Sequence, residues 1–136
     1  MRYEPHPDEI AAVPSMSDEE LLEYFLYRIF ETDEVWGLKS GSRWQTRQWQ
    51  DLETLPVWPY KRYADDAASY DWANGKPIAE SVETFTYRIL NNADKAGQVI
   101  EIMPRSASAV GCLIKPQRLF VMLENMMEAR ESHVGD

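Results

Sequence analysis

The chain has 136 residues, of which 44% are hydrophobic and 12% aromatic, and its formal net charge is −9. This length and composition predict a globular protein with one buried core and exclude a disordered chain. The acidic charge argues against DNA or RNA binding through the phosphate backbone, and the single cysteine, Cys112, excludes an internal disulfide.

The sequence shows no sign of export or of a membrane span. Its first residues lack the basic and apolar regions of a secretory signal, and no apolar run approaches the ~20 residues that a membrane helix needs. Cys112 lies in the apolar run 110–114, where a free thiol packs as a small hydrophobe. We therefore expect a cytoplasmic protein that has no membrane partner.

The N-terminal third of the chain contains the first strong periodic signal. Residues 1–16 hold prolines and scattered acids without any periodicity, which predicts a flexible arm. Ser17 and Glu20 have the spacing of a capping box, and apolar residues then recur every three or four positions up to about residue 32. These features predict a helix over 17–32 that begins a single globular domain.

Short strand patterns follow this helix. Residues 34–39 and 44–49 are predicted strands joined by a turn at 40–42. Side chains alternate along a strand, so Trp44 and Trp49 should point to opposite faces.

A third short strand is predicted at 55–59. Its two prolines, which cannot donate hydrogen bonds in a sheet, place it at an edge or at a strand end. A short helix at 60–69 is expected next.

The C-terminal half predicts two long helices around a second pair of strands. A turn at 74–77 leads to a helix at about 80–95, which Gly97 follows. The residues of this helix expected to face inward are Val82, Phe85, Ile89 and Leu90.

A strand at 98–103 should place Ile100 and Ile102 on one face and Glu101 on the other. Residues 110–114 are its expected antiparallel partner. A final helix begins at Pro116, with Leu119, Phe120, Leu123, Met126 and Met127 facing inward.

Grouped strands with short connections favour an α+β fold over a parallel sheet built by alternation. We expect a single compact domain over residues 17–131, with a frayed tail at 132–136. Its sheet should be small, antiparallel or mixed, with about five short strands packed by three main helices.

All five tryptophans lie between residues 36 and 72, and the one locally basic part of the chain, residues 35–63, holds four of them. They form either core or a recognition surface, because aromatic residues dominate buried area while Trp and Arg also carry interface hot spots. The first hypothesis is a non-enzymatic interaction protein that binds a protein partner through an aromatic and basic patch. The predicted patch residues are Trp49, Arg47, Arg43, Lys61 and Arg62.

A version of this hypothesis rests on charge alone: the acidic N-terminal region would neutralise a basic toxin, as an immunity protein does. The alternative hypothesis is a small-molecule binding protein or enzyme with a Trp-lined pocket. In that pocket Trp58 and Tyr60 would stack on a planar or sugar-like ligand.

The sequence leans away from catalysis. His6 and His133 lie in the predicted arm and tail, so neither is held in place as a base or metal ligand, and no metal or cofactor is expected. Asp65, Asp66 and Asp71 are interpreted as the solvated face of a short polar helix and not as a catalytic cluster. No nucleophile elbow surrounds the serines at 106 and 108, and no glycine-rich phosphate loop is present.

Residues 34–38 (EVWGL) and 55–59 (LPVWP) resemble segments of a family of small bacterial proteins catalogued as domain of unknown function 2750. The resemblance runs from about Asp18 to Glu131, and its specific element is the Trp-Pro pair. Relatives often carry His directly after that pair, where this chain has Tyr60, which argues against His-based chemistry. The resemblance implies a compact bacterial cytoplasmic domain and no particular reaction.

Overall fold

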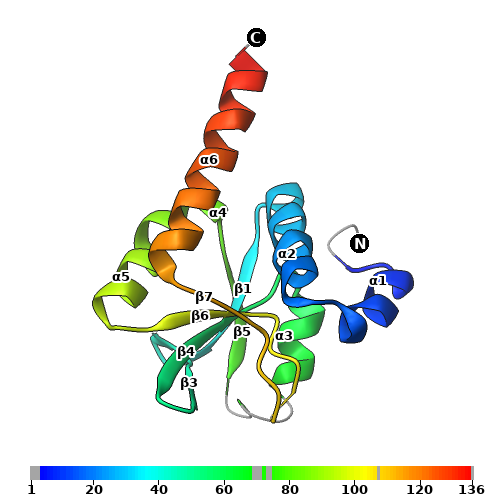
Figure 1. Ribbon diagram of the computed structural model, residues 1–136, viewed down its shortest axis with the longest axis vertical. Coiled ribbons are helices and arrows are strands. Elements are labelled where there is room, and N and C mark those ends of the chain that lie inside the picture. Colours follow the sequence, from blue (N-terminus) through cyan, green and yellow to red (C-terminus); the bar gives the residue numbers. More distant parts are fainter. Residues whose placement is uncertain (1–3, 69–71, 73–74, 107, 136) are drawn as a thin grey trace.

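The computed structural model describes residues 4–68, 72, 75–106 and 108–135, with side chains up to residue 130. Over these residues the protein has an α+β fold, with helices packed around two sheets (Figure 1). The strands are β1 (Val35–Ser40), β2 (Arg43–Trp44), β3 (Arg47–Trp49), β4 (Leu52–Val57), β5 (Lys76–Glu80), β6 (Val99–Ile102) and β7 (Cys112–Ile114). The helices are α1 (Pro7–Ala12), α2 (Asp18–Thr32), α3 (Lys61–Ala67), α4 (Val82–Thr84), α5 (Leu90–Lys95) and α6 (Pro116–Gly135).

The two sheets differ in topology. One has the strand order β2-β1-β5 and is antiparallel, whereas the other has the order β3-β4-β6-β7 and is mixed, because β4 and β6 run parallel. An antiparallel bridge between Trp36 and Trp58 links them. The α+β class is confirmed. The described residues hold seven strands in two sheets, where about five strands in one sheet were expected.

The first predicted helix is confirmed as α2. Ser17 and Glu20 form the expected capping box, with the Ser17 amide donating to Glu20 Oε1 at 2.9 Å and the Glu20 amide donating to Ser17 Oγ at 3.2 Å. Leu21, Phe25 and Ile29 are buried along one face of the helix. Helix α2 therefore packs as its sequence period predicts.

The predicted strand at 44–49 is wrong. The chain forms two short strands, β2 and β3, that belong to different sheets and are separated by Gln45 and Thr46. Trp44 pairs with Lys39 of β1, whereas Trp49 pairs with Leu52 of β4. Because the two tryptophans are not on one continuous strand, the argument from alternation does not apply to them.

The third predicted strand is present as β4, which begins earlier than expected, at Leu52. Pro56 lies beyond the pairing of β4 with β3, which ends at Thr54. The proline therefore sits past the end of one neighbour, as its missing donor requires.

Strand β5 stands where the sequence predicts part of a turn and the start of a helix. It pairs with β1 from Lys76 opposite Lys39 to Glu80 opposite Val35. Residue 74 of the predicted turn lies outside the described residues. Pro77 is tolerated because β5 is an edge strand, where one row of backbone amides needs no partner.

The second long helix is confirmed over residues 82–95, as α4, a π-helical stretch (Phe85–Ile89) and α5 in continuous succession. All four of its predicted inward residues are buried. Inside it, Thr86 Oγ1 donates to the Val82 carbonyl at 2.7 Å. Gly97 follows the helix with φ 74°, a conformation that favours glycine.

The last three elements lie where the sequence predicts them, but β6 and β7 are shorter than expected, and Phe120, Met126 and Met127 of α6 are half-buried. Strands β6 and β7 pair antiparallel, and α6 starts at Pro116 with Leu119 and Leu123 fully buried. Figure 1 shows that α6 continues well beyond the body of the protein. The helix extends to Gly135, through most of the segment expected to be a frayed tail.

The N-terminal segment forms structure where the sequence predicts a flexible arm. His6 caps α1, and a short 3-10 turn (Val13–Ser15) connects α1 to α2. Glu9 of α1 accepts hydrogen bonds from Tyr24 Oη at 2.9 Å and from Arg28 Nε at 3.0 Å, both on α2. These tertiary contacts hold a helix that is too short to persist alone.

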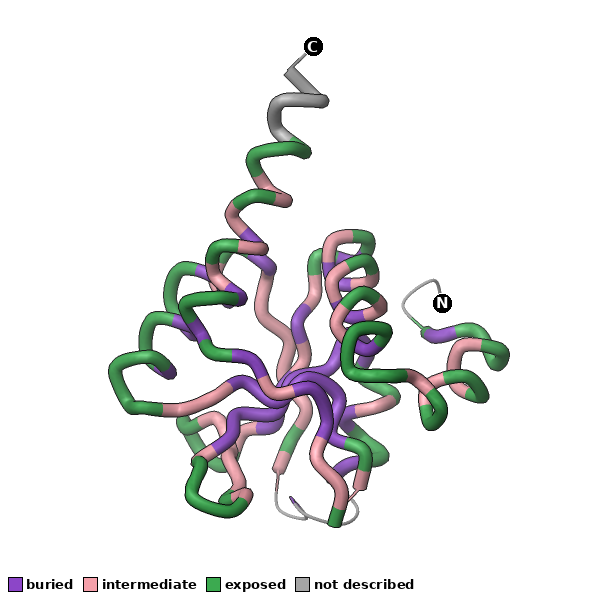
Figure 2. The backbone as a smooth tube through the Cα atoms, viewed as in Figure 1, coloured by how far each residue is buried: buried purple, intermediate pink, exposed green. Residues whose placement is uncertain are grey.

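Buried residues concentrate where the sheets meet the helices (Figure 2). The largest side chains among them are Trp58, Phe25 and Phe85. None of the helices traced in the described residues has the length and apolarity needed to pass through a bilayer.

Candidate ligand-binding cleft beside Trp44

The tryptophans of the segment 36–72 divide into two classes by burial. Trp58 is 2% exposed and Trp72 is 3% exposed, and their rings pack edge to face with centroids 5.7 Å apart. Trp36, Trp44 and Trp49 are each half-buried. Only the second class has ring surface that a ligand or partner reaches.

Trp58 and Tyr60 do not offer the stacking surface that the sequence suggested for them. Tyr60 is 3% exposed and packs beside Tyr63, with ring centroids 6.1 Å apart. Both rings are buried at the junction between β4 and α3. Both residues therefore belong to the core of this structure.

Arg47 forms a buried ion pair. Its Nε and Nη2 donate to Glu101 Oε1 and Oε2 at 3.1 and 2.6 Å, and the side chain of Glu101 is fully buried. Glu101 also accepts hydrogen bonds from Thr54 Oγ1 at 2.9 Å and from the Gly111 amide at 3.0 Å. This network ties β3, β4 and β6 to the chain before β7, so Arg47 has a structural role.

The same guanidinium is enclosed by aromatic rings. Its Cζ lies 5.6 Å from the ring centroid of Trp49 and 5.2 Å from that of Trp72. Its Nη1 donates to the Ser106 carbonyl at 2.9 Å. Trp49 therefore packs beside the buried guanidinium of Arg47 and is itself half-buried.

Lys61 and Arg62 are exposed at the start of α3 and pair with acids one helical turn later. Lys61 Nζ lies 2.9 Å from Asp65 Oδ2, and Arg62 Nε lies 3.5 Å from Asp66 Oδ2. Asp65 and Asp66 thus lie on the exposed face expected for them, and Asp71 is outside the described residues. The predicted patch is distributed over two sheets and a helix.

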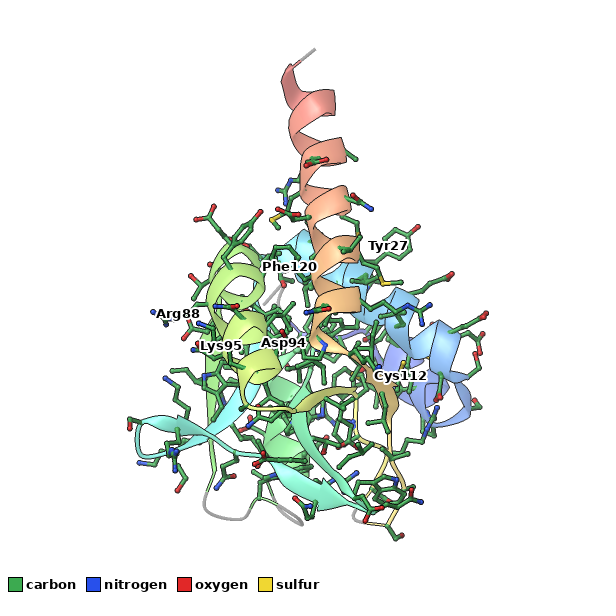
Figure 3. The ribbon with its side chains drawn as sticks, turned by 60° about the vertical axis from the view of Figure 1, so that its left-hand side comes forward. Tyr27, Arg88, Asp94, Lys95, Cys112 and Phe120 are labelled. Atoms are coloured by element: carbon green, nitrogen blue, oxygen red, sulfur yellow. The ribbon has the colours of Figure 1, made fainter. Side chains whose placement is uncertain are left out.

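Arg43, a member of the predicted patch, lines a cleft beside a tryptophan ring. A cleft of about 350 Å³ lies between the β1–β2 hairpin and α5. It is lined by Ser42, Arg43, Trp44, Leu55, Ile89, Asn92, Ala93, Ala96 and Gln98. In Figure 3 the helix that carries Arg88, Asp94 and Lys95 lies above the cyan β1–β2 hairpin. Residues of this helix and of the hairpin line the cleft from two sides.

The hairpin places Arg43 and Trp44 at the mouth of the cleft. Ser40 pairs with Arg43 across a two-residue loop whose first residue, Gly41, has φ 65°, the backbone that tight hairpins require. The Trp44 ring lies against Gly37, where a Cβ would overlap it. Gly37 therefore makes room for the ring.

The cleft combines an apolar wall with unused polar groups. Leu55, Ile89 and Ala93 continue into the core and form the apolar side. Within the described part of the chain, Arg43 has no carboxylate within 4.0 Å, and the side chains of Ser42, Asn92 and Gln98 make no hydrogen bond. The cleft therefore presents one cation and several neutral hydrogen-bonding groups beside an indole ring.

Other groups with chemical potential are not part of this lining. Cys112 is 7% exposed, and burial raises the pKa of its thiol, which disfavours the reactive thiolate. A second hollow, of about 320 Å³, lies between α5 and α6 with Tyr87 and Phe120 in its wall. The described side chains include no group of three His, Cys, Asp or Glu arranged to hold a metal ion.

The sequence analysis named Arg43 but not Trp44 among the binding residues, and Trp58, which it proposed for stacking, is buried. The signal for Trp44 is its position directly after Arg43 in a predicted hairpin, opposite a glycine-containing strand. The contribution of α5, through Asn92, Ala93 and Ala96, has no local signal. Those residues reach the cleft only because the helix folds over the hairpin.

The sequence matches the model of a protein family over residues 22–123, and the description of that family is protein of unknown function, DUF2750. A search of the curated proteins found no match.

Proposed function

The chain belongs to the DUF2750 family, and we propose that it is a binding protein that holds a small organic anion in the cleft beside Trp44. The observation that carries this proposal is the pairing of an unneutralised Arg43 with a half-buried indole ring in one concave site. Ligand sites in proteins have volumes of about 300–1,000 Å³ and join apolar walls to a few polar groups. A cleft of about 350 Å³ meets this description.

Each wall of the cleft has a separate task. The Trp44 ring and the apolar side formed by Leu55 and Ile89 accept a flat or aliphatic portion of the ligand. Arg43 recognises a carboxylate or a similar anion, for which the planar guanidinium fork is suited. The amides of Asn92 and Gln98 then fix the orientation of the bound molecule.

The lining favours binding over catalysis. Its polar members are Ser42, Arg43, Asn92 and Gln98, and none of these is an ordinary general acid or base near neutral pH. Ser42 has no histidine or lysine in the lining to activate it. This composition supports a binding role for the cleft.

The test is a panel of aromatic and aliphatic carboxylates, read by Trp fluorescence and thermal melting. A ligand at about 100 times its Kd should stabilise the protein by roughly 2.7 kcal/mol. We expect Arg43→Gln to weaken binding by about 10- to 100-fold, since charge-assisted hydrogen bonds contribute about 1.5–3 kcal/mol.

Lys61→Gln is the matched control, because it removes an exposed charge on α3 and should leave affinity unchanged. Binding that does not depend on charge, or that Arg43→Gln leaves intact, would overturn the proposal.

A second candidate function is protein binding at the tip of the β3–β4 hairpin. Trp49 lies directly opposite Leu52, a large apolar residue that is 37% exposed. β3 is also an edge strand of its sheet. Together these provide a small apolar surface beside a free strand edge, a combination that partner strands and loops use.

This candidate is tested by comparing Leu52→Ser with wild type in crosslinking from cell extract. A partner whose capture depends on Leu52 but not on Tyr27, an exposed ring on α2, would support hairpin binding. Equal capture by Leu52→Ser and wild type would remove the candidate.

A further inference from the structure

Three side chains form a row across the β2-β1-β5 sheet. Lys39 of β1 lies opposite Trp44 on one side and opposite Lys76 of β5 on the other. Directly opposed residues in antiparallel strands project to the same face, with Cβ atoms about 4.5–5.5 Å apart. The two lysines and the ring that lines the cleft therefore share one face of the sheet.

A hollow of about 290 Å³ accompanies the two lysines. It is lined by Lys39, Gly41, Lys76, Pro77 and Ile78. Ile78 pairs with Gly37, the residue on which the Trp44 ring lies. Lys39 and Ile78, which line the hollow, therefore share a sheet face with Trp44, which lines the cleft.

The lysine pair is unfavourable without a counter-charge. Like charges directly opposite each other in a sheet are destabilising. In the described residues no carboxylate lies within 4.0 Å of either ammonium, although the protein carries a net charge of −9.

Protection of a sheet edge explains the position of Lys76 but not that of Lys39. Lysines and prolines on edge strands discourage pairing between molecules, and Lys76 and Pro77 of β5 suit that role. Lys39 is different, because β1 is the central strand of the sheet. An ammonium placed there, facing a second one, is better explained by an anion that occupies the hollow.

We infer that Lys39 and Lys76 form a subsite for a phosphate group, so that the small anion bound beside Trp44 is a phosphate monoester with a flat or apolar substituent. The inference rests on the proposed ligand-binding function of the cleft. Two adjacent ammonium groups match the double charge of phosphate, and lysine binds phosphate as a point charge. Trp44, directly opposite Lys39, then covers the substituent.

The test compares phenyl phosphate, benzoate and inorganic phosphate, at constant ionic strength, on wild type, Lys76→Gln and Lys39→Gln. Without ligand, we expect each lysine variant to melt at the same temperature as wild type or higher, because repulsion is relieved. With phenyl phosphate, each variant should bind at least tenfold more weakly than wild type. Their affinity for benzoate should stay unchanged.

The matched control is Lys115→Gln, which removes an exposed lysine between β7 and α6 and should alter neither result. Inorganic phosphate distinguishes a site for the free ion from one for the ester: binding of phenyl phosphate at least tenfold tighter supports the monoester, and equal binding overturns it. Phenyl phosphate binding that depends on Arg43 but not on either lysine overturns the subsite and leaves the proposed function standing. The absence of any aromatic anion binding removes the proposed function itself.

Discussion

The backbones of Trp36 and Trp58 exchange two hydrogen bonds, with the Trp36 amide 2.8 Å from the Trp58 carbonyl oxygen and the Trp58 amide 2.9 Å from the Trp36 carbonyl oxygen. This pair joins strand β1 of one sheet to the end of β4 of the other. Trp44 belongs to the first sheet and Leu55 to the second, and both line the same cleft. The bridge therefore fixes the relative position of two cleft walls.

The contact between Gly37 and Trp44 predicts a specific non-additivity. Gly37→Ala introduces a methyl group that overlaps the ring, and the resulting overpacking should cost about 1–3 kcal/mol of unfolding free energy. In a Trp44→Ala background the same change should cost little, because the ring is gone. Urea unfolding followed by circular dichroism measures both values, and an equal cost in the two backgrounds would show that the ring does not depend on Gly37.

The ion pair of Arg47 and Glu101 should dominate the stability of the mixed sheet. Arg47→Met leaves a buried carboxylate without its partner, and such changes typically cost about 3–5 kcal/mol. Arg62→Met, which breaks an exposed pair on α3, should cost less than about 1 kcal/mol. A double variant, Arg47→Met with Glu101→Leu, should regain much of the loss; a double variant as unstable as the sum of its parts would contradict this account.

Alkaline pH should destabilise the contact between α1, α2 and α3. Burial raises the pKa of Tyr60 to about 12, and the negative charge of Glu9 adds to the effect. Burial likewise raises the pKa values of Tyr24 and Tyr63, whose hydroxyl oxygens lie 2.9 Å apart.

A tyrosine whose folded pKa exceeds its unfolded value, about 10, favours the folded state while it is neutral. Its contribution is complete below pH 10 and is lost as the pH rises toward 12. Unfolding free energies measured between pH 8 and 12 should fall in this interval, and more steeply for wild type than for Tyr60→Phe. Tyr27→Phe, at an exposed ring on α2, should behave as wild type does.

Cys112 should be slow to react with a thiol reagent in the native protein. Its side chain is 7% exposed, and burial raises the pKa of the thiol, with Asp18 adding to the rise. Both effects lower the population of accessible thiolate. Modification with a disulfide reagent at pH 8 should therefore be much faster in urea than in buffer. Equal rates in the two solvents would contradict the burial.

The sequence predicted those elements whose own residues determine them. Helix α2 carries its cap and its buried face in consecutive residues, so local pattern was sufficient. Strand β5 was missed because Pro77 and the preceding turn residues suggest a break. Its stability comes from pairing with β1, far earlier in the chain. Helix α1 was missed for the same reason, since Glu9 is held by Tyr24 and Arg28.

The candidate site was predicted only in part because burial is a tertiary property. An Arg and an indole are recognisable in sequence as binding residues, yet Arg47 is neutralised by Glu101, 54 positions later. The alternation of side chains along the predicted strand placed Glu101 on the other face of the strand from Ile100 and Ile102. It did not indicate that both faces of β6 are buried. Arg43 remained available because no acid of the fold comes near it in the described residues.

The parallel pairing of β4 with β6 has a consequence for fragments of this protein. Leu55 and Val57 find their sheet neighbours, Ile100 and Ile102, only after the chain has passed through α3, β5 and the long helix. A ribosome-stalled or proteolytically clipped product that stops before Val99 leaves this apolar strand with an open flank. An unpaired strand edge can pair with strands from other molecules. We therefore expect such products to aggregate instead of accumulating as folded fragments.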